Sequence, residues 1–114
     1  HQVERNLRLV EALGFPAADR ALAVAIPDAA RVRARARLRA AGIDPGHRYA
    51  LVHPGASAVA RRYPPAAWGA VARMLEESGL RTLITGVEKE RPLVEEAVSI
   101  SPGSATLVGE TSLP

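Results

Sequence analysis

The strongest constraint on the fold is a repeating pattern of short apolar runs and amphipathic segments in the second half of the chain. The apolar runs cover residues 49–53, 80–85 and 105–108. Residues 65–78 and 88–99 separate them, and their apolar side chains recur every three or four positions. Strands that alternate with helices of this length are typical of parallel sheets with right-handed crossovers. We therefore predict a Rossmann-like α/β fold, a β-α-β-α-β unit with both helices on one face of a parallel sheet.

The residues before this unit are predicted to be mainly helical. Residues 2–13 carry an apolar stripe, and a second helix fits between Asp28, which would cap its start, and Gly42, which would end it. In this second segment five arginines alternate with apolar residues: Arg31, Arg33, Arg35, Arg37 and Arg39. The alternation would also fit a strand with a basic face, but Ala and Arg are good helix formers, so we favour the helix. Residues 21–26 could form a short strand.

The composition narrows the possible functions of the chain. Its 114 residues suit one small domain or a piece of a larger protein. It contains no cysteine, so disulfides and thiolate metal sites are excluded, and no apolar run approaches the roughly 18 residues of a membrane span. Although 14 of the 15 basic residues are arginine, the net charge is only +3, which argues against a dedicated nucleic-acid-binding domain.

Three loops follow the predicted strands, at residues 53–64, 86–90 and 109–113. Because the carboxyl ends of parallel strands meet at one edge of a sheet, ligands of such folds bind there. The side chains and glycines that we expect to bind a ligand at this edge are Ser57, Arg61, Gly86, Glu90, Gly109, Thr111 and Ser112. Arginine suits an anion, and a carboxylate that enters a helix can hold a ribose diol. The pattern therefore predicts a site for a nucleotide or another phosphorylated ligand.

Each of these residues also has a plain structural explanation. Arg61 and Arg62 could be ordinary loop charges, and Glu90 could simply complement the dipole of the helix that it enters. His53, at the end of the first strand, fits a hydrogen-bonded structural histidine, and no spacing of histidines suggests a metal site. The serines and the threonine could be turn and capping residues.

Several motifs nevertheless resemble one family when they are taken in order. They are Val52-His53-Pro54-Gly55-Ala56-Ser57, Arg61-Arg62-Tyr63-Pro64, Leu83-Ile84-Thr85-Gly86 with Glu90 four residues on, and Leu107-Val108-Gly109-Glu110-Thr111-Ser112-Leu113, preceded by Val3-Glu4-Arg5-Asn6-Leu7 and Leu13-Gly14. This series resembles the ADP-heptose:lipopolysaccharide heptosyltransferase family of glycosyltransferases.

The resemblance implies a GT-B architecture, in which two Rossmann-like domains face each other across a cleft. Residues 1–46 would be a helical linker segment from the end of the acceptor-domain region, and residues 47–114 the first half of the donor-binding domain. Arg61 stands where the family commonly has a lysine that contacts the donor diphosphate, and it would also stabilise that group as it departs. Ser57 would lie near the same phosphates, and Glu90 would face the ribose. The loop with Gly109, Thr111 and Ser112 would line the adenine pocket.

The resemblance implies transfer of a heptose-like sugar from an ADP-linked donor to a glycan or lipopolysaccharide-type acceptor, by direct displacement without a metal or other cofactor. The catalytic base and an Asp-Thr-Gly-type segment would lie outside these residues, so we expect no transfer by the chain alone. The resemblance implies a cytoplasmic location, with peripheral contact at the inner face of the membrane. We also expect the chain to self-associate, because half of a domain would leave an edge of its sheet unpaired.

Two other functions remain open. One is a non-catalytic Rossmann-like nucleotide- or phosphate-binding module, and the other is nucleic-acid binding through the arginine-rich helix.

Overall fold

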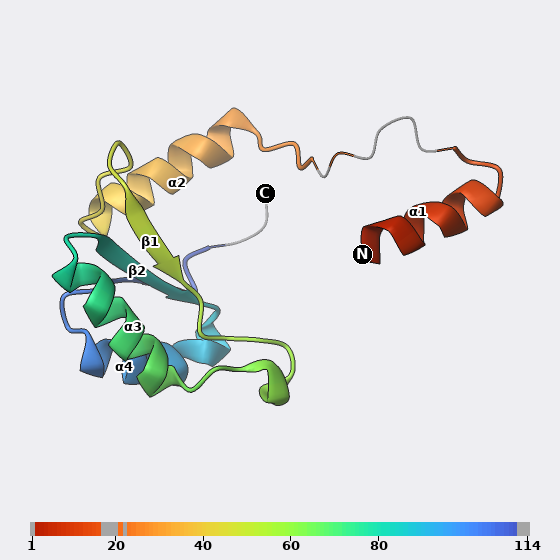
Figure 1. Cartoon of the computed structure of the whole chain (residues 1–114). Helices are drawn as coiled ribbons and strands as arrows, with labels where there is room; N and C mark the ends of the chain where they lie inside the picture. The colour runs from red at the N-terminus through yellow and green to blue at the C-terminus, as the bar shows by residue number, and fades with distance from the viewer. Residues whose placement is uncertain (1, 17–20, 22, 112–114) are drawn as a thin grey trace.

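The computed structural model describes residues 2–16, 21 and 23–111 (Figure 1). Its elements follow in the order α1 (Gln2–Ala12), α2 (Asp28–Ala40), β1 (Tyr49–Val52), α3 (Pro65–Glu77), β2 (Arg81–Gly86), α4 (Arg91–Ile100) and β3 (Ala105–Val108). Two short 3-10 turns, η1 (Val59–Arg61) and η2 (Glu88–Glu90), lie in the loops after β1 and β2. The predicted β-α-β-α-β unit is therefore confirmed.

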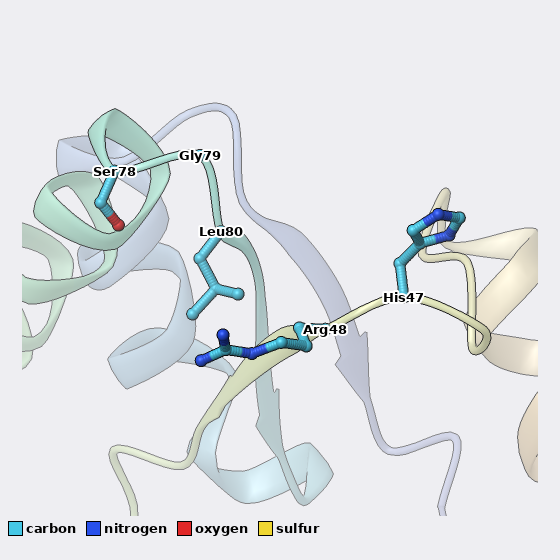
Figure 2. A pocket seen from close by; sticks show the side chains of 5 residues that line it. All are labelled: His47, Arg48, Ser78, Gly79 and Leu80. Atoms are coloured by element: carbon cyan, nitrogen blue, oxygen red, sulfur yellow. The ribbon is translucent and has the colours of Figure 1, made fainter.

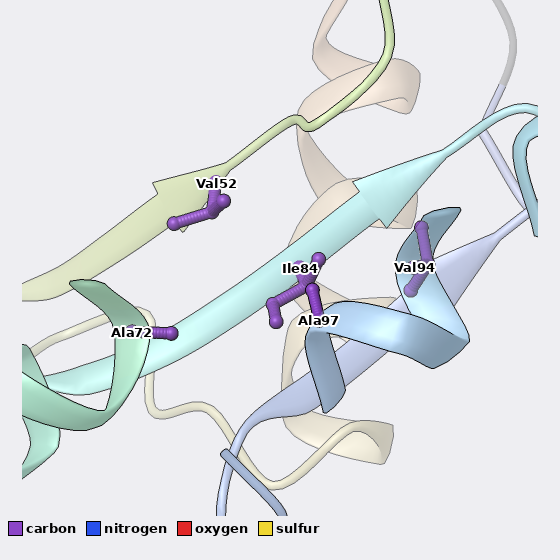
Figure 3. Packing of buried hydrophobic residues seen from close by; sticks show 5 residues of the cluster. All are labelled: Val52, Ala72, Ile84, Val94 and Ala97. Atoms are coloured by element: carbon purple, nitrogen blue, oxygen red, sulfur yellow. The ribbon is translucent and has the colours of Figure 1, made fainter. Parts of the chain in front are cut away.

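The three strands form one parallel sheet in the order β1-β2-β3. Leu51 is level with Leu83, and Leu83 with Ala105. Helices α3 and α4 cover the same face, as predicted, and lie side by side below the sheet in Figure 1. The core between helices and sheet consists of small and branched side chains, drawn in Figure 3: Val52, Ala72, Ile84, Val94 and Ala97. Trp68 packs against the margin of this core.

The other face of the sheet is covered in part by the C-terminal half of α2. Leu38 of this helix packs against a second buried cluster made by Ile43, Leu83, Ala105 and Leu107. The prediction that the arginine-rich segment is a helix is confirmed, and Gly42 follows it with a φ of +77°, which suits its predicted place at the end. Leu51 remains 60% exposed on this face, because α2 does not reach β1 there.

Three details of the predicted elements are wrong. The helix α2 takes Pro27 as its N-cap, and Asp28 lies inside the first turn, where its carboxylate makes no capping hydrogen bond. Residues 21 and 23–26 form no strand, since the strands of the described chain pair only with one another. The helix that we expected from residue 88 starts as the 3-10 turn η2 and becomes α-helical at Arg91.

Helix α1 stands away from the sheet in Figure 1, and none of its residues is buried. Its apolar stripe therefore finds no core within the described part of the chain. No helix among the described residues is long and apolar enough to cross a membrane.

Candidate functional site

The three loops that carry the predicted site residues all leave the carboxyl edge of the sheet. They follow Val52, Gly86 and Val108, the last residues of the three parallel strands. The second and third loops are joined directly, because the amide of Gly109 donates a hydrogen bond of 2.9 Å to the carbonyl of Gly86. These two predicted site residues thus hold the adjacent strand ends together.

The carboxylate of Glu90 is the most buried charged group at this edge, with only 6% of the residue exposed. Its Oε2 accepts a hydrogen bond of 3.0 Å from the amide of Val87, which closes the turn η2. The carboxylate lies directly over Gly55 of the first loop, where any Cβ would overlap it, and beside Gly86. Glu90 therefore joins the loop after β1 to the loop after β2.

His53 completes this cluster from the end of β1. Its Nε2 lies 3.6 Å from Oε2 of Glu90, and its Nδ1 lies 3.3 Å from the hydroxyl oxygen of Thr85. The Thr85 hydroxyl in turn donates to the carbonyl of Val52 at 3.5 Å. The imidazole is 47% exposed, whereas the side chain of Glu90 beneath it is only 8% exposed.

Arg61 and Ser57 form a second, exposed group farther along the first loop. A guanidinium nitrogen of Arg61 donates to the Ser57 hydroxyl, and among the described residues no carboxylate pairs with it. Arg62 behaves differently, because its Nε donates a 3.1 Å hydrogen bond to the Ala56 carbonyl and so holds the loop itself. Neither guanidinium has a carboxylate partner among the described residues, and Arg61 is the more exposed of the two, so it is the better placed to meet an anion.

Tyr63 packs at the end of the same loop, as expected. Its ring meets that of Trp68 edge to face, with 5.5 Å between the ring centroids and 80° between the planes. This contact fixes the loop to the start of α3, where Pro65 occupies the first turn.

The third loop lies against an ion pair at the start of α4. Arg91 donates two hydrogen bonds of 2.7 Å to the two carboxylate oxygens of Glu88. The guanidinium lowers the pKa of the Glu88 carboxyl below its usual range. Gly109 lies beside this pair, since a Cβ there would stand 2.7 Å from Oε2 of Glu88. Thr111 is exposed, and Ser112 lies outside the described residues.

The predicted site residues thus form two groups rather than one. Glu90 and Gly86 are buried at the centre of the edge, and Gly109, although exposed, is hydrogen-bonded to Gly86, whereas Ser57 and Arg61 lie on the exposed part of the first loop. A ligand that touched both groups would need an anionic part and a hydroxyl-bearing part. Residues 2–16, 21 and 23–111 include no group of three His, Cys, Asp or Glu side chains placed to hold a metal.

A hollow at the opposite edge of the sheet contains none of the predicted site residues. Figure 2 shows its lining, where the segment entering β1 meets the turn between α3 and β2: His47, Arg48, Ser78, Gly79 and Leu80. Because the strands begin there, the hollow lies away from the three loops.

Sequence reasoning missed the two partners of Glu90. The apposition of Gly55 and the contact of His53 depend on how the first loop folds back over η2, and neither spacing nor periodicity encodes that path. The only signal was the position of the His-Pro-Gly segment directly after an apolar run.

Comparisons with known proteins agree with this architecture. The model of glycosyltransferase family 9 (heptosyltransferase) matches residues 1–114. The structure resembles the crystal structure of the glycosyl transferase family 9 from Veillonella parvula DSM 2008, with a TM-score of 0.77 and 18% identity. The likeness covers 91% of this chain and 30% of that one, so this chain spans about a third of the length of the protein that it resembles. No curated protein matches the sequence. The match of the family model over its full length shows that the chain belongs to glycosyltransferase family 9, the heptosyltransferase family.

Proposed function

We propose that this chain supplies part of the donor-binding site of a glycosyltransferase, and that its carboxyl-edge loops hold a nucleoside diphosphate, ADP in the first instance. Family membership supports sugar transfer in general terms. The observation that carries the proposal is the pair of groups at one sheet edge. An unpaired arginine with a hydroxyl partner suits phosphates, and a nearly buried carboxylate suits sugar hydroxyls.

Arg61 would bind the diphosphate. Within the described part of the chain its hydrogen-bond partner is the neutral Ser57 hydroxyl, so an incoming phosphate would break no ion pair there. Two phosphate oxygens could bind the guanidinium fork while Ser57 donates its own proton to a third. In sugar transfer the same charge would stabilise the diphosphate as it leaves the anomeric carbon.

Glu90 would receive ribose hydroxyls through its unused oxygen. The hydrogen bond from the Val87 amide and the contact with His53 both fall on Oε2, whereas Oε1 packs against Gly55 and accepts no hydrogen bond from the described residues. No side-chain oxygen or nitrogen that is fully buried within the described chain lacks a partner, so Oε1 retains some contact with solvent. One donated hydroxyl would satisfy an atom that is otherwise poorly solvated.

The third loop would face the base, as the resemblance to the family implies. Gly109 is tied to Gly86 and lies against the Glu88–Arg91 pair, so a base there would meet a fixed and compensated pair of charges. Gly109, Thr111 and Ser112 remain our candidates for that contact.

We infer that the whole enzyme transfers a heptose-like sugar to a glycan or lipopolysaccharide-type acceptor in the cytoplasm, at the inner face of the membrane. The mechanism would be direct displacement without a metal. An acceptor hydroxyl would attack the anomeric carbon, its proton would pass to a carboxylate, and the nucleoside diphosphate would depart.

Calorimetric titration of ADP into the chain tests the proposal. We expect Arg61→Ala to weaken binding roughly 10-fold or more, since a hydrogen bond to a charged group contributes about 1.5–3 kcal/mol. Arg61→Lys should retain part of the affinity, because it keeps the charge and loses the fork. Arg33→Ala, on the exposed surface of α2, removes an equal charge elsewhere and serves as the control. Equal losses in the Arg61 and Arg33 variants would reduce the effect to net charge and reject the assigned role.

A further inference from the structure

The side chain of Arg62 closes the loop that carries the proposed phosphate-binding pair. Its Nε donates a hydrogen bond of 3.1 Å to the carbonyl of Ala56, six positions earlier in the chain. This bond joins the residue before Ser57 to the residue after Arg61. The hydrogen bond between the side chains of Arg61 and Ser57 therefore lies inside the ring that Arg62 closes.

Both ends of this loop are fixed by other contacts. At its start, Gly55 packs against the buried carboxylate of Glu90. At its end, the ring of Tyr63 packs edge to face on that of Trp68. Between these anchors, the two backbone hydrogen bonds of the turn η1 each span only three positions. Among the described contacts, the hydrogen bond from Arg62 is thus the one that ties the start of the exposed segment to its end.

The atom that Arg62 uses shows what the loop requires from this side chain. The Ala56 carbonyl accepts from Nε, so the loop needs an N–H donor at that distance from the backbone. Glutamine has its amide nitrogen at the same number of bonds from the backbone and offers such a donor without a charge. The structural part of Arg62 is therefore separable, by substitution, from its positive charge.

We propose that Arg62 is a positioning residue that closes residues 56–62 and so holds Ser57 and Arg61 in the arrangement that receives the donor diphosphate. The role rests on the proposed function. Arg62 need not touch the phosphates, because its effect passes through the loop. Without the hydrogen bond to Ala56, the loop and the two side chains would have to be ordered when the diphosphate binds, and this ordering lowers affinity.

The test compares ADP with adenosine, which lacks both phosphates, by calorimetric titration in about 0.15 M salt, where distant charges are screened. The quantity measured is the dissociation constant of adenosine divided by that of ADP. Arg62→Met keeps the stem and loses the donor, and it should lower this ratio about fivefold through ADP alone. Arg62→Gln should stay within about twofold of the wild type. Arg33→Met, on the exposed surface of α2, removes an equal charge and should leave the ratio unchanged.

A double-mutant cycle shows whether the effect passes through Arg61. In an Arg61→Ala background, Arg62→Met has no guanidinium left to position, so it should change the ADP affinity less than about twofold. The full fivefold loss of ADP affinity in that background would mean that Arg62 acts independently of Arg61, and it would reject the positioning role.

The remaining outcomes separate this role from the proposed function. If the wild type binds no ADP, both fail. If ADP binds in an Arg61-dependent way while Arg62→Met keeps the wild-type ratio, only the positioning role is rejected. Equal losses in Arg62→Gln and Arg62→Met would assign the effect to charge, and equal weakening of ADP and adenosine would assign it to the fold; either result rejects the role. Should Arg62→Met fail to fold, a lowered ratio in Arg62→Gln still rejects it.

Discussion

The substitution Gly55→Ala tests the packing at the centre of the proposed site. Gly55 does not have a positive φ, so the backbone itself tolerates alanine. The added Cβ would nevertheless overlap the carboxylate of Glu90, which is buried. We therefore expect the carboxylate to be displaced and its hydrogen bond from the Val87 amide to be lost.

The expected magnitude follows from two opposing effects. A hydrogen bond to a charged acceptor contributes about 1.5–3 kcal/mol. Replacing glycine by alanine at a compatible backbone position stabilises by about 0.4–1 kcal/mol, because the unfolded chain loses freedom. The free energy of unfolding should therefore fall by roughly 1–2 kcal/mol, which lowers the Tm of a chain of this size by about 4–8 °C.

Urea denaturation followed by the fluorescence of Trp68 provides the assay, since this is the one tryptophan in the sequence and it packs beside the core. The control is Gly55→Ala in a Glu90→Ala background, where the overlap no longer exists. There the substitution should be neutral or stabilising by up to about 1 kcal/mol. The same destabilisation in both backgrounds would refute the argument, because the loss could not then come from the carboxylate.

Three further predictions concern other parts of the structure. Gly69→Ala should lower the Tm, since its Cβ would overlap the carbonyl of Ala97 and force α3 and α4 apart. The overlap should cost about 1–3 kcal/mol, and the better helix propensity of alanine should offset only about 1 kcal/mol of it. An unchanged or higher Tm would contradict this. The amide of Gly46 lowers the pKa of the Asp44 carboxyl, so this group stabilises the fold above its unfolded pKa and the gain is lost as the pH falls through its folded pKa. Asp44→Asn should therefore lower the urea midpoint at pH 7 and match the wild type in strong acid, whereas a difference independent of pH would rule out the carboxylate. Leu51, 60% exposed on the open face of the sheet, should promote self-association, and light scattering should show less of it in Leu51→Lys; identical masses would show that this face is not involved.

Most of the fold followed from the sequence, because the local patterns agree with the tertiary structure. Each strand is a short apolar run, and α3 and α4 bury the stripes that their periodicity indicated, as Ala72 and Val94 show, whereas the stripe of α1 is not buried. One of the errors came from a shift of a single residue. Asp28 has the right chemistry for a cap, but Pro27 occupies the N-cap position. Asp28 is therefore already helical, and its side chain makes no capping hydrogen bond.

The candidate site was less accessible to sequence reasoning. Parallel topology alone placed Arg61 and Glu90 at the same edge, since both follow strands that end there. The burial of Glu90 was not predictable from the sequence. It depends on contact with Gly55, 35 positions earlier in the chain, and on the path of the irregular loop that contains Gly55. Only the atomic positions show that one of its oxygens accepts a hydrogen bond from the Val87 amide while the other packs against Gly55.

The most direct test of the account is to map ADP binding by the amide chemical shifts of the isotopically labelled chain. If the carboxyl-edge loops bind the nucleotide, the shifts should concentrate in residues 53–62, 86–91 and 109–111, and Arg61→Ala should remove them at the same ADP concentration. The hollow lined by Arg48 and Ser78 at the opposite edge should not respond. Shifts confined to that hollow, or an unchanged pattern in Arg61→Ala, would contradict the claim that the carboxyl-edge loops bind the nucleotide.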